Sequence, residues 1–134
     1  MRRSLKLFIK EAWSTIEPNR FYNDNWHIDA ISDHLQAIVN GDMKRLIINI
    51  PPRHMKSISV SVALPAWTWT IDPTKKFLFA SYALSLSIRD SVKCRRLIES
   101  DWYKEYFGGT FKLTTDQNQK QRFENDQTGQ RIAT

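Results

Sequence analysis

Two consecutive prolines, Pro51 and Pro52, interrupt an apolar part of the chain and constrain its fold strongly. The run before them, RLIINI (45–50), is short, β-branched and uninterrupted, which is typical of a strand buried on both faces. Each proline fixes φ and lacks an N–H donor, so strand pairing is expected to end here. After a basic cluster at 53–56 the chain is apolar again, and we expect a helix from about Ser57 to Trp69. The stretch therefore predicts a strand, a stiff basic turn and a helix in succession.

The rest of the chain shows further regular patterns. Apolar residues at helical spacing predict helices over Leu5 to Ile16, Ile28 to Val39 and Leu84 to Ile98. Pro18 and Gly41 are plausible stop signals for the first two helices, and Pro65 is expected to kink the helix that contains it. KKFLFASY (75–82) predicts another buried strand, and the polar tail from Phe111 to Thr134 predicts a β-hairpin around the turn-like QTG. The order strand, helix, strand, helix is typical of an α/β fold with a parallel sheet.

The overall composition narrows the class of protein. The 134 residues are enough for one domain, and 41% hydrophobic residues indicate a globular chain. A net charge of +6 favours contact with polyanions such as nucleotides or DNA. The single cysteine, Cys94, excludes an internal disulfide, and we expect it to be a small apolar residue on a helix. No apolar run approaches the ~18 residues that a membrane-spanning helix needs, so no membrane association is expected.

The basic turn has the order of parts found in phosphate-binding loops. Such loops need a buried strand, a tight turn, a lysine for the β- and γ-phosphates, a Ser or Thr hydroxyl for Mg²⁺, and a helix. Lys56 and Ser57 stand at the required place, but Ile50 and Met55 occupy positions that the common pattern gives to glycine. A basic surface loop between a strand and a helix is therefore an equally weighted interpretation of the turn.

Several stretches together resemble a known family. NIPPRHMKS followed by LPAW resembles the ATPase domain of the terminase large subunit, the DNA-packaging motor of tailed bacteriophages. NWHIDAISDHLQAIVNG resembles that family's adenine-side segment, and RFENDQTGQRIAT resembles its hairpin before the Walker B strand. The resemblance implies a P-loop NTPase-like parallel sheet with flanking helices, truncated before the Walker B strand. Residues 1–134 would be the N-terminal part of the ATPase domain: a helical lead-in at 1–41, a βαβ unit at 45–99 with a Walker A-like loop at 51–57, and a hairpin at 111–134.

The resemblance also implies roles for individual residues. Lys56 would contact the β- and γ-phosphates, Ser57 would hold Mg²⁺ through its hydroxyl, and Arg53 would sense the γ-phosphate. Lys56 and Arg53 are thus the candidate catalytic residues, and Trp26 and His27 are candidates for the adenine side, against the alternative of a half-buried tryptophan and a polar loop histidine. The nucleotide-binding set is Pro52, Arg53, His54, Met55, Lys56, Ser57, Trp26 and His27.

The implied function is the nucleotide-binding part of an ATP-driven motor that packages double-stranded DNA into proheads, with ATP and Mg²⁺ as cofactors. By resemblance its partners would be the phage genome, the portal protein and the small terminase subunit, with self-association left open, in the cytoplasm of the bacterial host. ATPase activity is left open because the Walker B acids and the nuclease domain are missing from this sequence. No acidic residue follows four apolar residues as a Walker B acid would; those considered are Asp72, Asp101, Asp116, Glu124 and Asp126.

The sequence leaves two hypotheses about the function open. The alternative to a motor component is a non-catalytic phage remnant, or an interaction module, that retains a phosphate-binding loop. A helicase-type NTPase is a weaker rival because of the Pro-Pro-Arg-His loop. His34 and four tryptophans are expected to have structural roles. The charge run RDSVKCRR (89–96) is expected to be a solvated helix face. The four tryptophans are Trp13, Trp67, Trp69 and Trp102.

Overall fold

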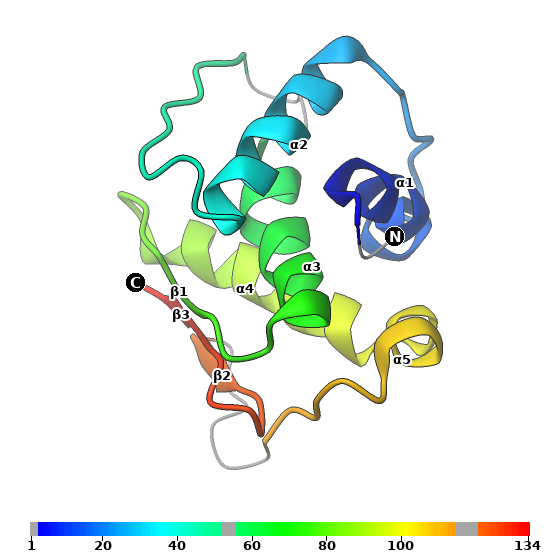
Figure 1. The fold of residues 1–134 in the computed structure, drawn as a ribbon, viewed down its shortest axis with the longest axis vertical. Coiled ribbons are helices and arrows are strands. Elements are labelled where there is room, and N and C mark those ends of the chain that lie inside the picture. The colour runs from blue at the N-terminus through cyan, green and yellow to red at the C-terminus, as the bar shows by residue number, and fades with distance from the viewer. Residues whose placement is uncertain (1–2, 52–55, 115–120) are drawn as a thin grey trace.

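The computed structural model describes residues 3–51, 56–114 and 121–134. Its helices surround one central helix, and its small sheet lies at one side of the molecule (Figure 1). The elements follow in the order α1 (Leu5–Ile16), α2 (Trp26–Val39), η1 (Ile58–Ala63), α3 (Leu64–Ile71), β1 (Lys76–Phe79), α4 (Leu84–Glu99), α5 (Asp101–Phe107), β2 (Arg122–Glu124) and β3 (Gln130–Ala133).

The centre of the fold is a continuous helical run made of η1 and α3. The first part, η1, is a π-helix, and the chain passes into the α-helix α3 at Leu64. Every side chain from Leu64 to Thr70 is buried, and helices α1 and α4 pack against this run. The change of helix type comes one residue before Pro65, where the sequence predicted a kink or a local break, and the helical run continues past this proline.

The three helices predicted from apolar spacing are confirmed by α1, α2 and α4, within a few residues at their ends. Ser4 caps α1 by accepting a hydrogen bond from the Leu7 N–H at 3.2 Å. The Asn25 side chain accepts from the Trp26 N–H at the start of α2, at 2.8 Å. After α2, Gly41 takes a positive φ of 85°, a conformation that glycine adopts without a Cβ penalty.

The sheet has three strands in the order β1-β3-β2. Strand β3 runs parallel to β1, with Lys76 opposite Gln130, and antiparallel to β2, with Arg122 opposite Ile132. The predicted hairpin is confirmed by β2 and β3, and the strand expected within 75–82 by β1. However, β1 is not buried on both faces, because Leu78 is 69% exposed.

The predicted P-loop NTPase-like parallel sheet with flanking helices is wrong. The structure is mostly helical (53%), and its sheet is small and mixed rather than parallel. In this fold the apolar faces of the helices cover one another, and the aromatic core forms between helices. A truncated version of the predicted sheet is equally unsupported, since the segment 45–50, which was expected to form a strand buried on both faces, lies outside the sheet.

The segment 45–50 is extended but is not a strand in the described part of the chain. Leu46, Ile48 and Ile50 pack partly against the core, whereas Ile47 is 85% exposed. This alternation is the period of extended backbone with one covered face. The β-branched run therefore has strand-like geometry without a neighbouring strand among the described residues, which is why the sequence pattern suggested a buried strand.

The interior is rich in aromatic contacts. Trp69 is fully buried and meets Phe111 and Phe123 edge-on, with ring centroids 5.4 and 5.8 Å apart. The Tyr103 hydroxyl donates to the Ala66 carbonyl at 2.8 Å, which ties α5 to α3. Trp13, Trp67 and Trp69 are buried and Trp102 packs against the core, so the structural role expected for the tryptophans is confirmed. His34, by contrast, lies on the exposed side of α2.

A buried arginine joins the sheet to the helices. Arg131 on β3 is fully buried, and its guanidinium carbon lies 4.2 Å from the centroid of the Phe79 ring. Its Nη2 donates to the Ser61 carbonyl of η1 at 2.7 Å. Burial lowers the pKa of Arg131, and the same burial raises the pKa of the neighbouring Cys94 thiol to about 11. Cys94 is thus the inert, buried helical residue that its sequence context predicts.

We predict that Gly129→Ala destabilises the fold by about 1–3 kcal/mol, the usual range for overpacking. A Cβ at this position would lie 2.2 Å from the Pro73 carbonyl oxygen and 2.6 Å from the Asn125 amide nitrogen. These two groups are hydrogen-bonded to each other at 2.8 Å, so neither is free to move away. Urea unfolding measures the change. Gly109→Ala is the matched control, because its Cβ would meet nothing within 4 Å; equal effects of the two substitutions would contradict the packing described here.

A second prediction concerns Cys94. Because the thiolate is the reactive form, folded protein at pH 8 should react with a thiol reagent far more slowly than urea-unfolded protein. The raised folded pKa also means that the neutral buried thiol stabilises the fold in full below its ordinary pKa of 9.0. This contribution is lost as the pH rises through about 11. Labelling of folded protein as fast as that of unfolded protein would show that the thiol is accessible.

Candidate functional site

One large pocket lies between the end of α1, the start of α2, the beginning of the central helical run and α4. Its volume is about 880 Å³, within the range of small-molecule sites. Its walls come from segments far apart in sequence. The lining residues are Trp13, Glu17, Arg20, Phe21, Asn23, Asn25, His27, Ile50, Pro51, Lys56, Ser57, Ile58, Arg89, Asp90 and Lys93.

Three residues singled out in the sequence line this pocket: His27, Lys56 and Ser57. Trp26, the other adenine-side candidate, is 76% exposed and is not part of the lining. Pro52, Arg53, His54 and Met55 lie outside the described residues. The structure thus brings together one base-side candidate and two phosphate-side candidates.

Lys56 and Ser57 stand where the described helical backbone begins, directly before η1. Ser57 has helical dihedral angles (φ −63°, ψ −39°) and makes no side-chain capping bond. Unpaired N–H groups and the helix dipole make the start of a helix favourable for anions. Both side chains are exposed on the pocket wall, so a ligand in the pocket could reach them.

The opposite wall is built by a turn fastened to α1. The Trp13 indole N–H donates to the Arg20 carbonyl at 2.9 Å, and the Arg20 N–H donates to the Glu17 carbonyl at 3.2 Å. Because Trp13 is buried, these bonds anchor residues 17–20 against the helix. Phe21 follows directly and is 94% exposed while lining the pocket, so a large aromatic face is presented to it.

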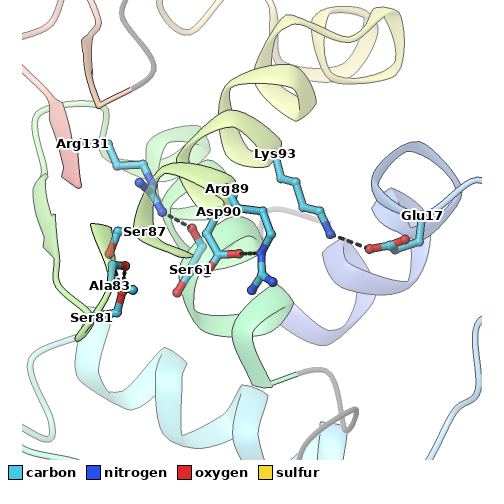
Figure 2. Close-up of polar contacts among 9 residues, drawn as sticks. All are labelled: Glu17, Ser61, Ser81, Ala83, Ser87, Arg89, Asp90, Lys93 and Arg131. Atoms are coloured by element: carbon cyan, nitrogen blue, oxygen red, sulfur yellow. Dashed lines mark hydrogen bonds and ion pairs between the residues drawn. The ribbon is translucent and has the colours of Figure 1, made fainter. Parts of the chain in front are cut away.

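The contribution of α4 to the pocket lining was not predicted from the sequence. Arg89, Asp90 and Lys93 belong to the charge run 89–96 that was expected to be a solvated helix face, yet all three line the pocket. Figure 2 shows Arg89 beside Asp90 and Lys93 reaching toward Glu17. The Arg89 Nε lies 3.5 Å from the Asp90 Oδ1, and the Lys93 Nζ lies 2.8 Å from the Glu17 Oε1. The four-residue spacing of Arg89 and Lys93 was the available signal, because such residues share a helix face.

The charges of the lining favour an anionic ligand. Among the described residues it holds four cationic side chains and two carboxylates. The cations are Arg20, Lys56, Arg89 and Lys93, and the carboxylates are Glu17 and Asp90. Each carboxylate is engaged by a cation of α4, and no described carboxylate forms an ion pair with Lys56. A partly enclosed cleft with an excess of one charge concentrates ligands of the opposite sign.

The acids of the terminal hairpin are not part of this pocket. Glu124 pairs with Arg122 at 2.6 Å, and the Asp126 carboxylate accepts from the Lys112 N–H at 3.0 Å. Neither residue is among those that line the pocket. Over the described ranges, no group of three or more His, Cys, Asp or Glu side chains could hold a metal ion.

Comparisons with protein-family models, with curated proteins and with solved structures find no match to this chain. The terminase resemblance therefore rests on the sequence motifs. In the part of the chain that the structure describes, no helix combines the length and apolar character needed to cross a membrane.

Proposed function

We propose that the pocket binds a nucleoside triphosphate, and that the chain is the nucleotide-binding part of a DNA-packaging motor of the terminase kind. The observation that carries the proposal is the convergence of His27, Lys56 and Ser57 on one pocket. Their sequence context alone marks them as base-side and phosphate-side candidates. The excess of cationic groups on the same lining supports an anionic ligand.

The phosphates would be held at the beginning of the helical run. Lys56 supplies a point charge, and the first N–H groups of the helix add partial positive charge. Arg20 and the α4 cations line the same pocket, so further phosphate oxygens have partners within it. Bonds of this charge-assisted kind are shorter and about twice as strong as neutral ones. The phosphate chain would thus supply much of the affinity.

The base would occupy the side of the pocket formed by the α1–α2 connection. His27 lies on this side of the lining, and Phe21 offers an exposed ring for stacking. Phe21 takes the place that was expected for Trp26, which does not line the pocket. Asn23 and Asn25 add donors and acceptors on this wall. The aromatic ring and the amide groups suit a flat heterocycle better than a bare polyphosphate.

Magnesium fits the site as a companion of the phosphates. Mg²⁺ in nucleotide sites keeps several waters and takes one or two protein oxygens in addition to phosphate oxygens. The Ser57 hydroxyl and the Asp90 carboxylate are the lining oxygens suited to this role. When bound, the ion would neutralise charge on the transferring phosphoryl group. Ser57 would then bind the ion, and Lys56 would orient the phosphates.

The wider biological role rests on the sequence resemblance alone. Double-stranded DNA, a portal protein and a small terminase subunit are the partners it implies, in the cytoplasm of a bacterial host. The net charge of +6 is compatible with contact to DNA phosphates. The second candidate is a phage remnant or interaction module that binds nucleotide without turnover. It is favoured by the ion pairs that occupy both lining carboxylates.

We predict that Lys56→Ala weakens ATP binding by about 1.5–3 kcal/mol, the range for hydrogen bonds to charged groups. Isothermal titration with Mg-ATP measures the affinity. Lys104→Ala is the matched control, because Lys104 is an exposed lysine of α5 that does not line the pocket. Equal affinities of wild type and Lys56→Ala would reject the pocket as the nucleotide site.

We also predict that the chain alone hydrolyses ATP no faster than background. Hydrolysis needs a group that positions the attacking water in line with the transferring phosphorus. The lining carboxylates, Glu17 and Asp90, are paired with cations, and Glu124 and Asp126 are bound elsewhere. A phosphate-release assay tests the prediction, with Lys56→Ala as the control for contaminating activity. Release that depends on Lys56 would contradict it, and Asp90→Asn would then show whether Asp90 takes part.

A further inference from the structure

An ion pair closes one side of the pocket. The Lys93 Nζ of α4 lies 2.8 Å from the Glu17 Oε1 at the end of α1, and both residues belong to the lining. Their side chains are 34% and 19% exposed, so the pair is partly shielded from solvent. The two side chains point toward one another across the space between α4 and α1 (Figure 2). A ligand in the pocket would meet this pair on the wall formed by α4.

The stability of α1 gives no reason for an acid at position 17. Glu17 is the C-cap of α1, where the helix dipole is negative and an acidic side chain is unfavourable. The last turn of α1 contains no basic residue that would offset this charge. The backbone nevertheless fixes Glu17 there, since its N–H donates to the Trp13 carbonyl at 2.8 Å. The carboxylate is thus held at the pocket wall, with Lys93 as its counterion.

The cation that Glu17 engages is placed for a ligand. Lys93 follows Arg89 by four residues on α4, so the two side chains share one helix face. That face borders the pocket that also contains Lys56. In this structure Lys93 and Arg89 are each engaged by a carboxylate, whereas Lys56 has no carboxylate partner among the described residues. A polyanion that first meets Lys56 would compete with Glu17 for Lys93.

We propose that Glu17 is a built-in competitor of the ligand's phosphates, and that binding of a polyphosphate transfers Lys93 from Glu17 to the phosphate chain. This role of Glu17 rests on the proposed nucleotide site. The ligand feature concerned is the charge of the phosphate chain. A phosphate chain with several charges displaces the carboxylate. A single phosphate, which carries less charge, competes less well. Glu17 thereby weakens the binding of ligands that draw on Lys93, and this cost falls more on a triphosphate than on a monophosphate that leaves the pair intact.

Glu17→Gln tests the proposal because it keeps the shape of the side chain and removes its charge. Lys93 is then available to the ligand without competition. ATP binding should tighten by about fivefold, because an ion pair between partly exposed side chains no longer has to be broken. The affinity for AMP, which draws less on Lys93, should tighten by a smaller factor. Glu11→Gln is the control, since Glu11 is an exposed acid of α1 outside the pocket lining.

A double-mutant cycle separates competition from a general effect of charge. In a Lys93→Gln background there is no cation to release, so adding Glu17→Gln should leave ATP affinity unchanged. If Glu17 acts only through its electric field, the same substitution should tighten binding in both backgrounds, and the proposal is then overturned. A Lys93→Arg background, which keeps the ion pair, should preserve the gain. Lys93→Met, which also removes the cation, serves as the test if Lys93→Gln is not folded by circular dichroism.

The outcomes distinguish this inference from the function on which it rests. Weaker ATP binding by Lys56→Ala with no tightening by Glu17→Gln would overturn the competitor and leave the nucleotide site standing. Equal ATP binding by wild type and Lys56→Ala would remove the nucleotide site itself. Tightening of ATP binding by Glu17→Gln that depends on Lys93, together with a smaller gain for AMP, supports the proposal.

Discussion

Burial of the helical run from Ile58 to Ile71, complete from Val62 to Thr70, is the constraint on which the rest of the structure depends. All side chains from Leu64 to Thr70 are buried, including two threonines whose hydroxyls donate to carbonyls of the same helix, Thr68 to Leu64 and Thr70 to Trp67. Polar groups so satisfied are tolerated in an apolar interior. Helices α1 and α4 cover this run, and Arg131 joins it to the sheet. The beginning of the same run emerges at the pocket, so the most buried element of the fold also carries Lys56 and Ser57.

The elements that could be predicted are those with local signals. Helices α1, α2 and α4 repeat apolar residues at helical spacing, and β2 and β3 flank a recognisable turn. The segment 45–50 was misjudged because a short β-branched run fits a strand, whereas pairing depends on neighbours distant in sequence. Helix α5 was not foreseen, although Ser100 caps it by accepting from the Tyr103 N–H at 3.2 Å. One wrongly placed strand was enough to change the fold class.

The candidate site also combines residues that the sequence pointed to with residues that it did not. Lys56, Ser57 and His27 were found because their neighbours in sequence form recognisable motifs. Glu17 and Lys93 are 76 residues apart, and no local pattern shows that they meet. The α4 charges were interpreted as a solvated face because apolar and charged residues alternate there with a helical period, and a period does not reveal what faces the charged side. Phe21 was overlooked in favour of Trp26, although both are aromatic residues of the same connection.

The π-helical start of the central run changes the direction in which the side chains of the site point around the helix axis. A π-helix accommodates its residues with a wider turn than the 3.6 residues of an α-helix, so η1 shifts the direction of every side chain before it relative to α3. In an α-helix each residue advances by about 100° around the axis. A regular α-helix from Lys56 to Ile71 would therefore point Lys56 and Ser57 to a different side when Trp67 and Trp69 stay buried. The azimuth of Lys56 and Ser57 around the helix axis is therefore set by the six residues of η1.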